Sequence, residues 1–277
     1  MEAHVARFLD EVARWAADRP DVRAAVLLGS QARVDAPADA SSDVDVALFV
    51  DYPAAYLDDT AWIDHFGEPL LGFREPTAVG GFEERRVLFR DGLEVDFAVV
   101  PAAVAAEIPS EADAVFARGF RVLYADGISF LEREPSSIET PAPTQARFDQ
   151  LANDFWYHLL WSAKKLWRGE VLVAKQACDG LLTGLLVELA RWRSEESDTW
   201  HGTRFFERWA GDDLVQALGP TFARYDAKDV ARALRAKAEL FGQVEDEVAA
   251  RHGLVVPEDR AEVLRRLEVL LDRRTVQ

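Results

Sequence analysis

The chain has 277 residues, 49% of them hydrophobic, which is enough apolar material for one large core or two smaller ones. Its formal net charge is −17, and so acidic a chain without a basic stripe is poorly suited to bind a nucleic acid. No apolar stretch approaches the roughly 20 residues that cross a bilayer, and the first residues lack the basic start and apolar middle of a signal peptide. We therefore expect a cytoplasmic protein with neither a nucleic acid nor a membrane as partner.

The N-terminal half predicts a mixed β-sheet flanked by helices. Apolar residues at helical spacing indicate a helix over residues 5–17, which Pro20 follows. Continuous apolar runs indicate strands, and Asp91-Gly92 between the last two main strands is typical of a hairpin turn. The expected strands cover 24–28, 44–50, 86–90 and 93–100, with a short helix over 61–66 and an edge strand with its turn over 120–127.

The C-terminal half predicts an α-helical bundle. A segment rich in proline and serine, residues 135–143, precedes it and marks a domain boundary. Long amphipathic stretches follow at 145–168, 170–194, 202–218, 227–252 and 258–273. The single cysteine, Cys178, excludes an internal disulfide and a cysteine-based zinc site, and it is expected as a small buried side chain on a helix. The expected fold class is α+β, with one domain over residues 1–140 and a second over 141–277.

Three aspartates on the predicted sheet have the pattern of a metal site. Asp43 and Asp45 flank Val44 at the start of one strand, so their side chains project from the same face. Two ionised carboxylates this close repel each other unless a cation lies between them, and Mg²⁺ prefers oxygen ligands. Asp96 is placed on a strand that could lie beside the first two, where it would complete the cluster.

A small-residue turn, Gly29-Ser30, lies between the first strand and these carboxylates. Glycine lets a backbone approach a phosphate closely, and the Ser30 hydroxyl and the charge of Arg33 could hold phosphate oxygens. An Asp-x-Asp or a Gly-Ser pair alone is common in an acidic chain. The ordered set, with flanking strands and a later aspartate, is instead typical of nucleotidyltransferases of the polymerase-β type.

The first long helix of the second half carries an uncommon polar row. Residues at spacings of three and four place Asp154, His158, Trp161, Lys165 and Arg168 along one side. Cations and a tryptophan on one face could hold triphosphate oxygens and a sugar-like ring, and Lys175 and Asp179 on the next helix could join them. The alternative is a solvated face with ordinary ion pairs, and His158 by itself is more typical of a structural role.

These motifs together resemble the aminoglycoside 6-adenylyltransferase family, the streptomycin adenylyltransferases, over most of the chain. The resemblance rests on these segments: Gly29-Ser30, Asp43-Val44-Asp45, 62–67, 88–96, Asp154-Phe155-Trp156, 163–170, 238–241 and 247–249. The helix rich in tryptophan and arginine is the most specific part, because the Gly-Ser and Asp-x-Asp elements belong to the whole superfamily.

The resemblance implies transfer of AMP from ATP to a hydroxyl of a cationic aminoglycoside, with release of pyrophosphate. Asp43, Asp45 and Asp96 would be catalytic and would bind Mg²⁺, and Asp96 would also take the proton from the acceptor. Contacts to ATP would come from Gly29, Ser30, Arg33, Lys165 and Arg168. Candidate contacts to the acceptor are Trp156, Trp161, Glu170 and Asp179.

Three alternatives remain open at this point. The acceptor could be a lincosamide or another small hydroxyl compound. The chain could modify a protein or an RNA, although its acidity argues against RNA. It could also be a catalytically silent nucleotide-binding module, although a non-enzyme has no need to hold repelling acids together. We expect a monomer or a weak dimer.

Overall fold

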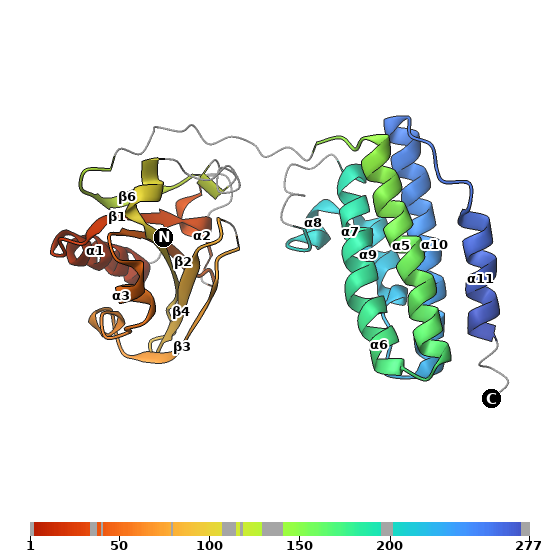
Figure 1. The fold of residues 1–277 in the computed structure, drawn as a ribbon, viewed down its shortest axis with the longest axis horizontal. Coiled ribbons are helices and arrows are strands. Elements are labelled where there is room, and N and C mark those ends of the chain that lie inside the picture. The colour runs from red at the N-terminus through yellow and green to blue at the C-terminus, as the bar shows by residue number, and fades with distance from the viewer. Residues whose placement is uncertain are drawn as a thin grey trace. The chain divides into compact units, whose positions relative to one another are not determined.

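The computed structural model describes residues 3–33, 38–39, 41–78, 80–106, 115–116, 119–128, 141–194 and 202–272. The chain forms two compact units, Met1–Ile138 and Glu139–Gln277, which we call unit 1 and unit 2. Unit 1 is a mixed sheet with helices and unit 2 is helical (Figure 1), which confirms the predicted α+β class. The predicted boundary near residue 140 and the proline-rich segment before it lie largely outside the described residues. None of the helices in the described ranges combines the length and apolar character needed to cross a bilayer.

Unit 1 contains a six-stranded sheet in the order β3-β4-β5-β2-β1-β6. Only β2 and β5 run parallel among neighbouring strands, so the sheet is mixed. The strands are β1 (Val22–Leu28), β2 (Val44–Val50), β3 (Pro69–Pro76), β4 (Glu83–Phe89), β5 (Glu94–Pro101) and β6 (Arg121–Ala125). Five of the six strands were predicted, and the hairpin between β4 and β5 turns at Asp91-Gly92 as expected. The remaining strand, β3, was missed.

One face of this sheet is covered by the larger core of unit 1. Helix α1 (Ala3–Ala17) buries its apolar stripe there, from Val5 to Trp15, and α3 (Pro53–Leu57) packs on the same core through Tyr56. A 3₁₀ helix, Ile63–His65, stands where the short helix over 61–66 was expected. The opposite face carries a smaller apolar cluster around Phe49 and Val100, and the predicted carboxylates project from this face.

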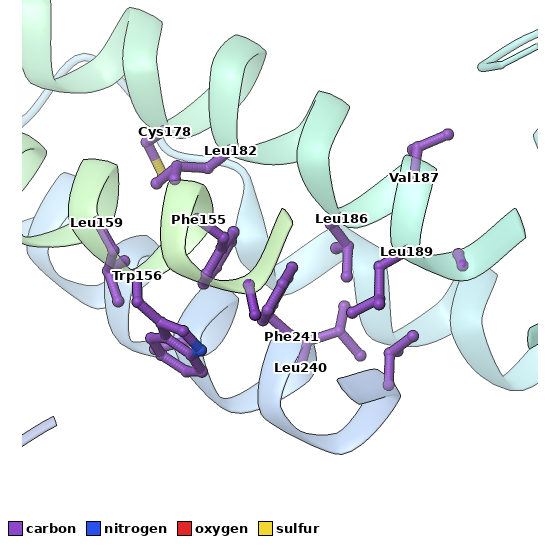
Figure 2. Close-up of a cluster of buried hydrophobic side chains, with 14 of the residues drawn as sticks. Phe155, Trp156, Leu159, Cys178, Leu182, Leu186, Val187, Leu189, Leu240 and Phe241 are labelled. Atoms are coloured by element: carbon purple, nitrogen blue, oxygen red, sulfur yellow. The ribbon is translucent and has the colours of Figure 1, made fainter. Parts of the chain in front are cut away.

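Unit 2 packs long helices around one core. Thr144 caps α5 (Gln145–Trp167) by accepting a hydrogen bond from the Arg147 backbone, and Asp226 caps α10 (Ala227–His252) in the same way. Phe155 of α5 stacks on Phe241 of α10 with ring centroids 3.6 Å apart, at the centre of the cluster in Figure 2. The other helices are α6 (Val171–Gln176), α7 (Leu182–Arg193), α8 (Phe206–Trp209), α9 (Asp212–Leu218) and α11 (Arg260–Asp272).

Two of the expected helices of unit 2 are interrupted. The stretch expected as one helix over 170–194 contains a π-helical turn, Ala177–Leu181, between α6 and α7. Buried Lys237 donates to the Cys178 carbonyl in this turn at 2.9 Å. The stretch over 202–218 divides into α8 and α9 because Gly211 adopts a φ of 86°, which lies outside the helical region. Cys178 is buried, as predicted.

Candidate active site

The turn that leaves β1 brings a glycine against the predicted metal site. Gly29 adopts a φ of 63° at the start of α2 (Gly29–Ala32). A Cβ at this position would lie 1.8 Å from Asp45 Oδ2, so only glycine allows this approach. The Ser30 hydroxyl beside it is buried and has no hydrogen-bond partner in the part of the chain that the structure describes. A buried hydroxyl in this state is open to an oxygen or a donor of a bound ligand.

Three aspartates meet at the carboxylate-bearing face of unit 1. The parallel register pairs Asp45 of β2 with Asp96 of β5, and Asp43 directly precedes β2. One carboxylate oxygen from each residue lies within 4.8 Å of the other two. The structure therefore brings together the three acids that the sequence predicted as neighbours, here called the triad.

The electrostatics of the triad are those of a site that needs a cation. Burial raises the pKa of Asp45 to about 6, and the negative charges of Asp43 and Glu84 add to the effect. Burial also raises the pKa of Asp96 to about 7, against the lowering effect of Arg86. Because a divalent ion among the three oxygens would stabilise their ionised forms, the donor set fits Mg²⁺, which binds carboxylates.

A network on β4, which the sequence analysis did not identify, borders the triad. Arg86 stands opposite Asp96 in the register and its Nη2 lies 3.3 Å from Asp96 Oδ2. The Nε of Arg86 lies 2.9 Å from Glu84 Oε1 and 2.6 Å from Glu75 Oε1. The alternation of β4 puts Glu84 and Arg86 on one face. The sequence predicted the hairpin of β4 and β5 but not its register, and it is the register that sets this face of β4 beside Asp96.

The Arg33 guanidinium lies near this cluster, close enough that its charge lowers the pKa of Asp45. Gly29 and Arg33 thus lie close to Asp45, and Ser30 follows Gly29 directly in the turn. Their role toward a nucleotide stays a prediction.

Two of the cations predicted as nucleotide contacts in unit 2, Lys165 and Arg168, form ion pairs with the same carboxylate, Glu170. Lys165 Nζ lies 2.9 Å from Glu170 Oε2, and Arg168 Nε lies 3.0 Å from Glu170 Oε1. These contacts hold the pKa of the Glu170 carboxyl below its ordinary value. Lys165 also stands over the Trp161 ring, 5.3 Å from its centroid. In this structure the charged side chains at the C-terminal end of α5 thus pair with Glu170. The triphosphate and acceptor contacts predicted for these residues stay predictions.

The other two candidates of unit 2 have different surroundings. Lys175 and Asp179 form an ion pair one helical turn apart, and Asp179 Oδ1 also accepts a hydrogen bond from the Ala223 backbone at 3.2 Å. Trp156 belongs to the core in Figure 2, where it is 4% exposed and its Nε1 donates to Glu245. The expectation of a direct acceptor contact from Trp156 needs correction, because core packing and this hydrogen bond occupy the whole indole.

Comparison with known proteins gives a consistent result across the chain. A sequence model of the streptomycin adenylyltransferase family matches residues 4–267. An aminoglycoside 6-adenylyltransferase from Campylobacter jejuni is 24% identical over 255 residues, covering 87% of each chain. One from Staphylococcus aureus is 22% identical over 257 residues, covering 87% of this chain and 89% of its own. The crystal structure of an aminoglycoside 6-adenyltransferase from Bacillus subtilis aligns at 18% identity with a TM-score of 0.45, covering 98% of this chain and 99% of that one.

Proposed function

The chain belongs to the streptomycin adenylyltransferase family, and on that premise we propose that it transfers AMP from ATP to a hydroxyl of a streptomycin-like aminoglycoside. Pyrophosphate is the other product. The observation that carries the proposal is the triad, whose three carboxylate oxygens lie within 4.8 Å of one another. We place the reaction in the cytoplasm, where ATP is supplied.

The triad residues divide the work according to their positions. Asp43, directly before β2, and Asp45 on β2 would hold the metal, with Asp96 of β5 as the third ligand. Bound there, Mg²⁺ would supply Lewis-acid stabilisation of the phosphoryl oxygens and of the acceptor oxygen. Asp96 would accept the proton of the acceptor hydroxyl, because a carboxylate that the metal keeps ionised can act as a general base.

The turn after β1 handles the nucleotide in this proposal. The Ser30 hydroxyl, buried without a partner among the described residues, donates a hydrogen bond to a phosphate oxygen. Arg33 offsets part of the negative charge that moves onto pyrophosphate as the α-phosphorus is attacked. Gly29 keeps the backbone close enough for both contacts because it has no Cβ to displace Asp45.

The test is an acceptor screen with the purified full-length chain. The protein is incubated with MgATP and a panel of aminoglycosides and lincosamides, pyrophosphate release is followed, and the adenylylated product is identified by mass spectrometry. We expect turnover with a streptomycin-like aminoglycoside and loss of turnover in EDTA. Turnover with a lincosamide alone would refute the proposed acceptor, and nucleotide binding without any turnover would favour a silent module.

A pair of matched variants tests the triad itself. Asp43→Asn keeps the side-chain shape but removes a charge that holds the metal, so activity should fall at least ~100-fold, a loss of about 2.7 kcal/mol in transition-state stabilisation. Asp10→Asn removes the same charge from an exposed position on α1 and should keep the wild-type rate. Near-normal turnover of Asp43→Asn at saturating MgATP would contradict the metal assignment.

A further inference from the structure

Strand β3, at the edge of the sheet in unit 1, leaves two large apolar side chains open to solvent. Leu71 is 65% exposed and Phe73 is 54% exposed, and β3 pairs only with β4 in the sheet. Single exposed apolar residues are ordinary on protein surfaces, but neighbouring ones beside a functional site suggest a binding surface. Their position relative to the triad therefore matters.

The strand register places both side chains on the face that carries the triad. Phe73 stands opposite Arg86, and Arg86 stands opposite Asp96. The ion pairs of Arg86 with Glu75 of β3 and Asp96 of β5 join the strands across this same face. Arg74, the residue between Phe73 and Glu75, turns the other way and pairs with Asp58 and Glu83.

The distance fits a ligand that reaches the triad. Two strand spacings separate Phe73 from Asp96, which puts their Cα atoms roughly 10 Å apart. Leu71 lies two residues before Phe73 on the same face of β3. It pairs in register with Leu88 of β4, which pairs with Glu94 of β5. A molecule with more than one ring can therefore rest on β3 while one of its hydroxyl groups lies at Asp96.

A carboxylate without a counter-ion stands next to this apolar surface. Glu94 is exposed and makes no ion pair or hydrogen bond through its side chain within the described ranges. Glu75 and Glu84, by contrast, share the Arg86 guanidinium. Glu94 is thus the acid near Leu71 that is available to a cationic group of a ligand.

From this arrangement, and resting on the proposed function, we infer that Leu71, Phe73 and Glu94 form a platform that binds the acceptor. The ligand class is a cationic glycoside: the apolar face of a sugar or cyclitol ring packs on Phe73 and Leu71, and an amino or guanidino group pairs with Glu94. The hydroxyl that receives AMP lies toward Asp96. The platform lies entirely within unit 1.

The test measures acceptor and nucleotide binding separately in the full-length enzyme. The variants are Leu71→Ser combined with Phe73→Ser, and Glu94→Gln alone. The control is Tyr52→Ser, which removes a 68% exposed aromatic side chain just beyond the far end of β2 from the triad. KM for the acceptor is measured at saturating MgATP, and KM for ATP at saturating acceptor, for each protein.

The double variant should raise the acceptor KM at least about tenfold, with kcat within about twofold of wild type and KM for ATP unchanged. Glu94→Gln should raise the acceptor KM and weaken its dependence on salt, because one screened charge pair is lost. Tyr52→Ser should behave as wild type. All the replaced side chains are exposed, and thermal melts check that each variant is folded.

Three outcomes would overturn the inference. The acceptor KM could stay unchanged in both variants, or KM for ATP could rise equally, which would place the nucleotide at this surface. Light scattering could show that the double variant loses a dimer while the acceptor KM is unaffected, which would make β3 an edge for pairing with a second copy. If the wild type modifies no aminoglycoside, the proposed function fails as well; with an active wild type, only the platform fails.

Discussion

Replacing the proposed catalytic base with its amide should stabilise the metal-free protein. Asp96 is buried beside Asp45 and Asp43, and its pKa rises from 3.8 to about 7. One pKa unit corresponds to about 1.36 kcal/mol, so keeping Asp96 ionised in the fold costs about 4 kcal/mol above pH 7. Asparagine has the shape and charge of the protonated carboxyl, so Asp96→Asn should raise the free energy of unfolding by roughly 2 to 4 kcal/mol at pH 8.

The sign of the pH dependence follows from the direction of the shift. The folded state binds the Asp96 proton more tightly than the unfolded state, so stability is lost as the pH rises from about 4 to about 7. The advantage of Asp96→Asn should therefore be full at pH 8 and about half as large at pH 5.5. Mg²⁺ should stabilise the wild type more than the variant, because only the wild type offers the third charged ligand.

The assay is urea denaturation in EDTA at pH 8 and pH 5.5, with Asp10→Asn as the control for loss of one negative charge. The activity of Asp96→Asn should be lost while its stability rises. If the variant unfolds at the same or a lower urea concentration than the wild type at pH 8, Asp96 is not destabilised by its neighbours, and the electrostatic account of the triad is wrong.

Three further perturbations have definite expected outcomes. Gly29→Ala should cut the rate of AMP transfer at least about tenfold, because the added Cβ would displace Asp45. The control, Gly81→Ala, has a similar φ of 67° and no atom within 4 Å of the added Cβ, so it should leave the rate unchanged. Arg260→Met should lower the free energy of unfolding of unit 2 by about 3 kcal/mol in urea denaturation, because it leaves the buried Glu245 carboxylate without its cation. Adding Glu245→Gln should recover part of that loss. The aminoglycoside KM should rise steeply between ~50 and ~500 mM salt, whereas a neutral acceptor would show little change.

Much of unit 1 could be predicted because its strands are buried. Most residues of strands β1, β2 and β5 are buried, so these strands read as nearly continuous apolar runs. Strand β3 has almost no buried residue, and its sequence, Pro-Leu-Leu-Gly-Phe-Arg-Glu-Pro, contains two prolines and a glycine that argue against a central strand. It is an edge strand that cross-strand pairing holds in place, and nothing local in its sequence signals that pairing.

The candidate site could be predicted only in part. Asp43 and Asp45 share a face through strand alternation, which the sequence shows directly. The Asp91-Gly92 turn predicted that β4 pairs with β5, but the contribution of Glu84 and Arg86 depends on the register that sets Arg86 opposite Asp96, and the sequence analysis did not derive that register. In unit 2, helical spacing correctly placed Lys165 and Trp161 together but could not show that Glu170 would pair with the cations at the helix end.

The balance of charge distinguishes the triad from the candidate acids of unit 2. In unit 2 the candidate acids have cations beside them, as Glu170 does with Lys165 and Asp179 does with Lys175. Around the triad, carboxylates outnumber guanidinium groups, since three acids share Arg86. Burial in addition raises the pKa values of Asp45 and Asp96. A fold held only by its own contacts gains nothing from such repulsion, whereas a site that binds a divalent cation requires it. The excess of partly buried negative charge at the triad, and not the acidity of the whole chain, is therefore the physical reason to expect metal-dependent chemistry here.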